Sequence, residues 1–581
     1  MLSQLVPVSV ALDKEEDRLP PMDPEAKDLQ CLDVAAVAGS WDRLVRSFLD
    51  GYFEAHPTFA AGTGRHEYDG RLPDWSLERI EAETAWLRAE RSRAAEFDPA
   101  TLDERRAFER EILSAVIDAD LFWLEAAEWH RRNPLFYAGP LDPNLYLARE
   151  YAPLEQRLRA YVGYARGVPR AAEQVRANLR TPMPRTHAEL GEMSFRGLAG
   201  YFESDVPAAF AAVDDADLQA EFRQANAVAA RAMRELGAWF HDQIPPAGED
   251  AGEFRLGADL FATMLWNTER VDVSPAELEE AGRRDLERNL AALREACAAY
   301  APGLPVAECL ARVEARKPEG GPVAAARRQL AGLRRFIEEK GLVSIPGAEE
   351  VRVEEAPPYQ RWNSAFIDVP GPYDRHLPSI YYIAPPDLSW TPEEQARYIP
   401  GEADLLFVTA HEVWPGHFLQ FLHSNRAESE LARLFVGYGF AEGWAHYSEE
   451  LMWEAGFGDG DPYLHIGQLQ NALLRNVRYV VALGLHTGSL TIAEAERMFR
   501  EQAFQDPANA RQQAARGTFD PGYLNYTLGK LMVRKLREDW TASRGGRSAW
   551  REFHDRFLSY GGPPVPLVRK TMLGGETGRL L

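Results

Sequence analysis

His411, Glu412 and His417 form the group whose residue types and spacing most directly predict chemistry in this 581-residue chain. In the helical motif H-E-x-x-H of zinc hydrolases, both histidines bind the metal, and the glutamate acts on the water that the metal activates. Here the second histidine comes two residues later than in that motif. Both histidines can therefore bind one metal only if the intervening residues, which include Pro415 and Gly416, correct the spacing.

The proline and glycine before His417 can supply this correction. On a regular helix, His411 and His417 would point roughly 240° apart and lie about 9 Å apart along the axis. Pro415 lacks the N–H group that would bond to the His411 carbonyl, and its ring clashes with that carbonyl, whereas Gly416 tolerates an unusual backbone. We expect a bulge that absorbs two residues and returns His417 to the metal. The alternative is a helix that ends at Trp414, followed by an unrelated histidine.

A second predicted helix carries candidates for the third ligand that a catalytic zinc site needs. Glu442, His446 and Glu449 recur at spacings of four and three residues, so they share one face of that helix. They could bind the metal or hold its ligands in place. Glu442 stands among apolar residues and is poorly explained as a solvated side chain, whereas for Glu450 we expect a solvated position.

The elements that position these residues are expected to give a mainly α-helical fold with a small β element before the zinc-binding helix. Amphipathic patterns predict long helices over 77–97, 101–129, 153–179, 186–198, 216–243, 274–300 and 324–340. Two short apolar runs, 365–369 and 379–384, predict strands that wall a cleft. An extended peptide could pair with an edge strand near 379–384.

We divide the chain into three parts on this pattern. Residues 1–33 are predicted to be a polar N-terminal extension, and 34–342 an N-terminal helical lobe. Residues 343–581 are predicted to be the zinc-binding catalytic lobe, made of the small sheet and further helices. The cleft is expected between the two lobes.

Composition limits the partners and the compartment. The net charge of -24 argues against nucleic acid and against anionic membrane surfaces as partners. No stretch has the roughly 18 apolar residues of a membrane span, and the first 25 residues do not resemble a secretory signal. Three cysteines are too few for a disulfide framework. We therefore expect a cytoplasmic protein, and no feature of the sequence predicts its oligomeric state.

Several motifs together resemble one known family. The two central motifs are His411-Glu412-x-x-Pro415-Gly416-His417 and Glu442-Gly443-Trp444-Ala445-x-Tyr447-x-Glu449. They resemble the domain-of-unknown-function family numbered 885, whose members are expected to be zinc peptidases distantly similar to the glutamate-zincin oligopeptidases. Other blocks that resemble the family are His66-x-Tyr68-Asp69-x-Arg71-Leu72-Pro73-Asp74, Arg475-x-x-Arg478 with His486, and Arg516-x-x-x-x-Pro521-Gly522 with Tyr526-x-x-Gly529-Lys530. The resemblance extends from about residue 40 to the end of the chain.

The resemblance implies one zinc ion per chain, bound by His411, His417 and Glu442, with Glu412 as general base. Zinc lowers the pKa of water to roughly 7, and a carboxylate beside the first ligand can pass the water's proton to the leaving amine.

The resemblance also suggests groups around the metal. An oxyanion needs a donor beyond the metal. Tyr526 is the first candidate and His486 the second, although either could be purely structural. Glu449 and His446 are candidates for supporting the ligands or contacting substrate. Arg478 and Arg516 could bind a substrate carboxylate, with internal salt bridges as the alternative.

These observations predict a zinc-dependent metallopeptidase that cleaves peptide bonds in short peptides. One alternative is a zinc amidohydrolase that acts on a small non-peptide amide with the same residues. Another is a non-catalytic helical binding protein with a vestigial metal site. That alternative is disfavoured because a pure metal-binding module would not need Glu412 directly after the first histidine.

Overall fold

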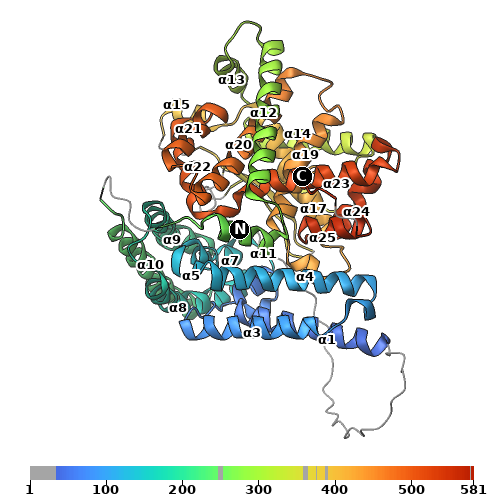
Figure 1. The fold of residues 1–581 in the computed structure, drawn as a ribbon. Coiled ribbons are helices and arrows are strands. Elements are labelled where there is room, and N and C mark those ends of the chain that lie inside the picture. Colours follow the sequence, from blue (N-terminus) through green and yellow to red (C-terminus); the bar gives the residue numbers. More distant parts are fainter. Residues whose placement is uncertain (1–33, 247–252, 357–363, 375, 387–389, 576–577) are drawn as a thin grey trace, which may run out of the picture.

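The computed structural model describes residues 34–246, 253–356, 364–374, 376–386, 390–575 and 578–581. The predicted N-terminal extension 1–33 lies outside the described residues. Figure 1 shows the early helices, coloured blue to teal, gathered in the lower part of the molecule, with the helices coloured green to red above them. The mainly α-helical fold that the sequence predicts is confirmed, together with its small sheet.

Helices fill the chain on both sides of the sheet. Those before residue 250 are α1 (Val34–Ala55), α2 (Pro57–Gly62), α3 (Leu77–Ala95), α4 (Glu104–Leu121), α5 (Trp129–Arg132), α6 (Leu135–Ala138), α7 (Asn144–Ala148), α8 (Leu154–Asn178), α9 (Arg185–Ala209) and α10 (Ala216–Asp242). Between them and the sheet lie α11 (Ala258–Glu269), α12 (Pro275–Tyr300), α13 (Val306–Glu314) and α14 (Pro322–Lys340). After the sheet come α15 (Pro392–Tyr398), α16 (Glu402–Glu412), α17 (His417–Ser424), α18 (Glu430–Leu434), α19 (Tyr438–Glu454), α20 (Pro462–Thr487), α21 (Ile492–Gln502), α22 (Pro507–Phe519), α23 (Asn525–Ala542), α24 (Trp550–Ser559) and α25 (Val565–Met572). Among the helices that the structure describes, none combines the length and apolar character of a membrane span.

The helices predicted from amphipathic patterns are confirmed, with shifts at their ends. The predicted helix 101–129 is shorter, because α4 ends at Leu121 and passes into a π-helical turn, Phe122–Ala126. The predicted helix 186–198 continues to Ala209 as α9. Ser274 caps α12 in a capping box with Glu277.

The sheet has three strands, β1 (Val351–Glu355), β2 (Ala365–Asp368) and β3 (Ser379–Ile383), in the order β1-β3-β2. β2 and β3 confirm the two predicted strands and pair antiparallel, while β3 pairs parallel with β1. The expectation of an edge strand near 379–384 is wrong, because β3 lies between β1 and β2 and pairs with both. Three of the five residues of β1 are charged, so the strand lacks the apolar run by which β2 and β3 were predicted. β2, on the far side of β3 from β1, is an edge strand of this sheet.

Buried apolar side chains form one large core and smaller ones. The large core joins α11–α14 to the helices that follow the sheet, and Gly282 of α12 lies directly against Tyr479 of α20. A second core lies within α8–α10, and a third joins α1, α3 and α4 to α18. These cores do not follow the division at 342/343, since helices from before that boundary share the large core with the helices after it.

Two glycines let α19 and α23 cross in backbone contact. A Cβ atom on Gly443 of α19 would lie 2.5 Å from the Cα of Gly529 on α23. A Cβ atom on Gly529 would lie 2.0 Å from the carbonyl oxygen of Gly439. Neither position therefore has room for a side chain, and this close contact sets how deeply α19 lies in the large core.

A histidine in the loop after α2 joins the early helices to the loop between β2 and β3. His66 places Nδ1 3.2 Å from Asp69 and Nε2 3.2 Å from Asp374, and its ring stacks on Tyr151 at 3.8 Å. Burial lowers the pKa of His66, but the two aspartates raise it more, to about 9. The charged imidazole therefore links two segments that are distant in the sequence.

Replacing His66 with glutamine should destabilise the protein in a pH-dependent way. Unfolded histidine has a pKa of about 6.5, so the folded state, with its higher pKa, binds the proton more tightly. The stabilisation is complete below pH 6.5 and is lost as the pH rises through about 9. We expect a difference in unfolding free energy of about 2 kcal/mol at pH 6, vanishing near pH 10, by urea denaturation. An equal difference in unfolding free energy at pH 6 and at pH 10 would contradict the pairing of a charged His66 with the two aspartates.

Candidate metal centre

The histidines of the central motif lie on two helices separated by a tight turn. α16 ends at Glu412, and α17 begins at His417. Within the turn, the N–H of Gly416 bonds to the carbonyl of Ala410, six residues back, and the N–H of Leu419 bonds to that of Val413. Each of these bonds spans six residues, whereas a regular helical bond spans four. The turn therefore absorbs the two extra residues of the motif, as expected. The structure differs from the expected bulge in that the helix is interrupted and not continuous.

This turn requires glycine at position 416. A Cβ atom there would lie 1.7 Å from the carbonyl oxygen of His411 and 2.6 Å from that of Ala410. The turn is also held from the neighbouring helix, where the indole N–H of Trp444 on α19 donates to the carbonyl of Pro415 at 2.8 Å. α19 therefore fixes the turn that places His417.

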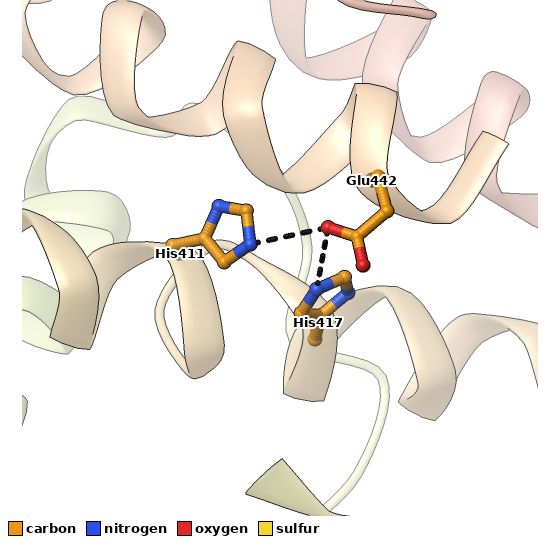
Figure 2. Close-up of side chains that lie close together, drawn as sticks. All are labelled: His411, His417 and Glu442. Carbon is orange, nitrogen blue, oxygen red and sulfur yellow. Dashed lines mark ion pairs between the residues drawn. The ribbon is translucent and has the colours of Figure 1, made fainter. Parts of the chain in front are cut away.

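The three predicted metal ligands converge at one point. Figure 2 shows Glu442 reaching down from α19 toward the rings of His411 and His417. Its Oε2 atom lies 3.3 Å from Nε2 of His411 and 3.3 Å from Nε2 of His417. Within the described residues, this is the group of three His, Cys, Asp or Glu side chains placed closely enough to hold a metal ion.

Two of the three donor separations match those of a small tetrahedral cation, and all three donor atoms lie within 4.8 Å of one another. Bonds of about 2.0–2.1 Å in tetrahedral zinc place neighbouring donors roughly 3.4 Å apart, close to the two observed separations. Burial raises the pKa of Glu442, but the charges of His417 and His411 hold it well below its usual range. Oε2 of Glu442 is buried, yet its contacts with the rings lack hydrogen-bond geometry. A cation would satisfy this oxygen.

A buried ion pair orients the first histidine. Glu449 of α19 accepts a hydrogen bond from Nδ1 of His411 at 2.7 Å, which turns Nε2 toward Glu442. A terminal nitrogen of Arg475 on α20 lies 3.2 Å from the same Glu449 oxygen, Oε1, and balances its charge. Burial opposes ionisation of Glu449, but Arg475 and His411 hold its pKa far below the usual range. Such a partner on the second ring nitrogen is typical of metal-binding histidines.

Glu412 lies beside this cluster and contacts the sheet. Its Oε2 atom accepts a hydrogen bond from the backbone N–H of Ile367 in β2 at 3.1 Å. Burial raises the pKa of Glu412, while the charges of His411 and His417 lower it. A carboxylate with a raised pKa is suited to accept and release a proton.

The structure brings one of the two predicted oxyanion donors to the cluster. Tyr526 of α23 stacks on His411 with ring centroids 6.4 Å apart, and its pKa is raised by burial and by the charge of Glu442. Within the described residues, its hydroxyl has no hydrogen-bond partner. His486 lies elsewhere. It follows Arg475 by eleven residues on α20, about 16 Å along the axis, and its Nε2 bonds to the carbonyl of Gly517 at 2.9 Å.

The remaining candidates on α19 support the structure. His446 is fully buried, with Nδ1 3.6 Å from Glu449, and burial lowers its pKa to about 4, so its ring is neutral. The expectation of a solvated Glu450 is wrong: this carboxylate is 6% exposed and pairs with Arg288 at 2.7 Å and Lys530 at 3.2 Å. The reason is that α12 and α23 cover this face of α19 and supply the cations.

Residues that the sequence did not assign to the site also shape it. Trp444 and Arg475 belong to motifs of the family, and this was the reason available in the sequence for assigning them to the site. The spacing of the motifs did not predict which atoms the two side chains contact. Ile367 carried no signal, because it acts through its backbone N–H.

Comparisons with known proteins support the resemblance. The chain is similar to a solved structure of a candidate lipoprotein of unknown function from Shewanella oneidensis, with 23% identity and a TM-score of 0.76 over 92% of this chain and 99% of that chain. It is also similar to a candidate lipoprotein from Colwellia psychrerythraea, with 18% identity and a TM-score of 0.75 over 93% and 99%. These similarities show a shared fold.

No curated protein matches the sequence. The model of the family described as "Bacterial protein of unknown function (DUF885)" matches residues 57–572, which is most of the chain. The chain therefore belongs to the DUF885 family, as its motifs predicted.

Proposed function

We propose that this protein is a zinc-dependent peptidase that hydrolyses peptide bonds in short peptides. The observation that carries the proposal is the convergence of His411, His417 and Glu442 beside Glu412. Two imidazoles and one carboxylate are the ligand set of many catalytic zinc sites, which leave a fourth position for water or substrate. A structural zinc site would have four protein ligands instead.

The surrounding residues have roles that suit hydrolysis of an amide. A zinc ion in this site would supply Lewis acidity, which polarises a carbonyl and acidifies water. Glu412 takes a proton from the attacking water and delivers it to the leaving amine. The Tyr526 hydroxyl donates to the oxygen on which negative charge develops. The Glu449–Arg475 pair keeps the His411 ring in one orientation during the reaction.

The neighbouring strand favours a peptide over a small amide. β2 is an edge strand, and its Ile367 contacts Glu412 directly. An extended peptide can add to an exposed strand edge through its own backbone hydrogen bonds. A substrate held along β2 would therefore bring a peptide bond to the general base. A small amide would make no use of this edge.

Purified protein should contain about one zinc ion per chain, and His417→Gln should remove most of it. The substitution deletes one of three ligands, and loss of a ligand weakens zinc binding by several orders of magnitude. Metal content is measured by mass spectrometry after dialysis. His423→Gln is the matched control, since His423 lies on the same helix but bonds to the carbonyl of Ser344. Full zinc content in the His417 variant would exclude this histidine from the site.

Glu412→Gln should retain zinc and lose catalytic turnover. The amide keeps the size of the side chain but cannot accept the proton, so kcat should fall by about 10²–10⁴. A digest of a peptide library by the wild-type enzyme identifies the substrate, and the variant is then measured on the best peptide. Unchanged turnover in the variant would contradict the role of Glu412. Hydrolysis of small amides with every peptide left intact would favour the amidohydrolase.

A further inference from the structure

Arginines gather around Tyr526, the ring that stacks on His411. The guanidinium of Arg478 lies 5.2 Å from the centroid of the Tyr526 ring, and that of Arg475 lies 5.9 Å from it. Arg516 of α22 donates to the hydroxyl of Tyr438 at 3.1 Å. The Tyr438 ring in turn packs edge-on against Tyr526, with centroids 5.6 Å apart. Three positive charges therefore border the metal centre.

The three arginines differ in how their charge is balanced. Arg475 pairs with Glu449 at 3.2 Å, and Arg516 pairs with Asp520 at 2.8 Å. Among the residues that the structure describes, Arg478 donates only to the neutral side chain of Gln513, from Nε at 2.9 Å. In the described part of the chain, no carboxylate forms an ion pair with Arg478.

The missing counter-ion makes Arg478 a receptor for an anion. Burial and the charges of Arg516 and Arg475 lower the pKa of Arg478, so its environment disfavours the positive charge. Arg478 is half-buried, and an unbalanced charge that is partly withdrawn from water is costly unless a ligand compensates it. Because Gln513 binds Nε, the two terminal nitrogens remain for a ligand, and a guanidinium presents such a pair to one carboxylate as two parallel hydrogen bonds.

We propose that Arg478 binds the free C-terminal carboxylate of the peptide substrate, so that the enzyme cleaves near the C-terminus. The inference rests on the proposed peptidase function and names its substrate class. One aromatic ring separates Arg478 from the histidine of the metal centre. The two centroid distances, 5.2 and 6.4 Å, place the guanidinium at most about 12 Å from the His411 ring. A hydrogen bond to the carboxylate covers about 3 Å of this distance, and an extended peptide advances about 3.3–3.6 Å per residue, so one to three residues span the rest.

The products follow from this placement. The amide C–N bond breaks, the oxygen of water joins the acyl carbon, and both protons of water pass to the nitrogen of the leaving group, which becomes an ammonium. The product that carries the original C-terminus is an amino acid, a dipeptide or a tripeptide. The rest of the peptide leaves with a new carboxylate.

Binding measurements on the zinc-loaded Glu412→Gln protein test this inference without turnover. Calorimetric titrations compare tetra-alanine, its C-terminal amide, and Ala-Ala-Ala-Glu amide, which offers a side-chain carboxylate only. We expect tetra-alanine to bind about 10- to 100-fold more tightly than either amide, because the pair between Arg478 and the terminal carboxylate is lost in both. Equal affinities of tetra-alanine and its amide would overturn the inference, as would preferential binding of the glutamate peptide.

The second arm of the experiment assigns the preference to Arg478. When Arg478→Gln is added to the Glu412→Gln protein, the ratio between the affinities for tetra-alanine and for its amide should fall to about one. Arg497 is an exposed arginine on α21, and adding Arg497→Gln instead should leave this ratio unchanged. An unchanged ratio in the Arg478 variant would overturn the assignment.

Cleavage by the wild-type enzyme separates this inference from the proposed function. Equal cleavage of tetra-alanine and its amide would support the peptidase function but contradict the preference for a free C-terminal carboxylate. Failure to cleave any peptide would instead count against the peptidase itself.

Discussion

The contact between Gly416 and the carbonyl oxygen of His411 is the constraint on which the metal centre depends. A single Cβ atom at position 416 would overlap that oxygen, so the two surplus residues of the motif fit only with glycine there. Trp444 then fixes the turn by bonding to Pro415 from α19, the helix that also carries Glu442. One helix thus supplies Glu442 and holds the turn that places His417 beside His411. The crossing of α19 and α23 at Gly443 and Gly529 sets its depth.

Charge is concentrated around this centre, and buried partners balance it. On the metal side of α19, Glu449 is fully buried between His411 and Arg475. On the opposite side, Glu450 lies among Arg288, Lys530 and Arg534. Buried ion pairs contribute little net stability, but removing one partner is expensive because the other charge stays buried. These networks therefore hold α19 in a single position. Arg478 lies next to them without a carboxylate partner, which is why it stands out as a binding residue.

The sequence predicted the long helices, two of the three strands and the three side chains that converge, because each depends on local patterns or on motif spacing. Amphipathic periodicity extends over many residues, and proline and glycine act on their immediate neighbours. The features it missed depend on contacts between distant segments. β1 was not predicted, so β3 was taken for an edge strand. Glu450 resembled a solvated residue because its cations come from α12 and α23. The hydrogen bond from the backbone N–H of Ile367 to Glu412 could not be predicted, because a backbone donor does not depend on the type of residue that carries it.

X-ray absorption at the zinc edge reports the atoms bound to the metal. We expect two imidazole nitrogens and one carboxylate oxygen at about 2.0–2.2 Å, with a further light atom completing the site. In His417→Gln, any zinc that remains should show the scattering of one imidazole only. Zinc bound by sulfur, or a wild-type spectrum without imidazole scattering, would contradict the proposed ligand set.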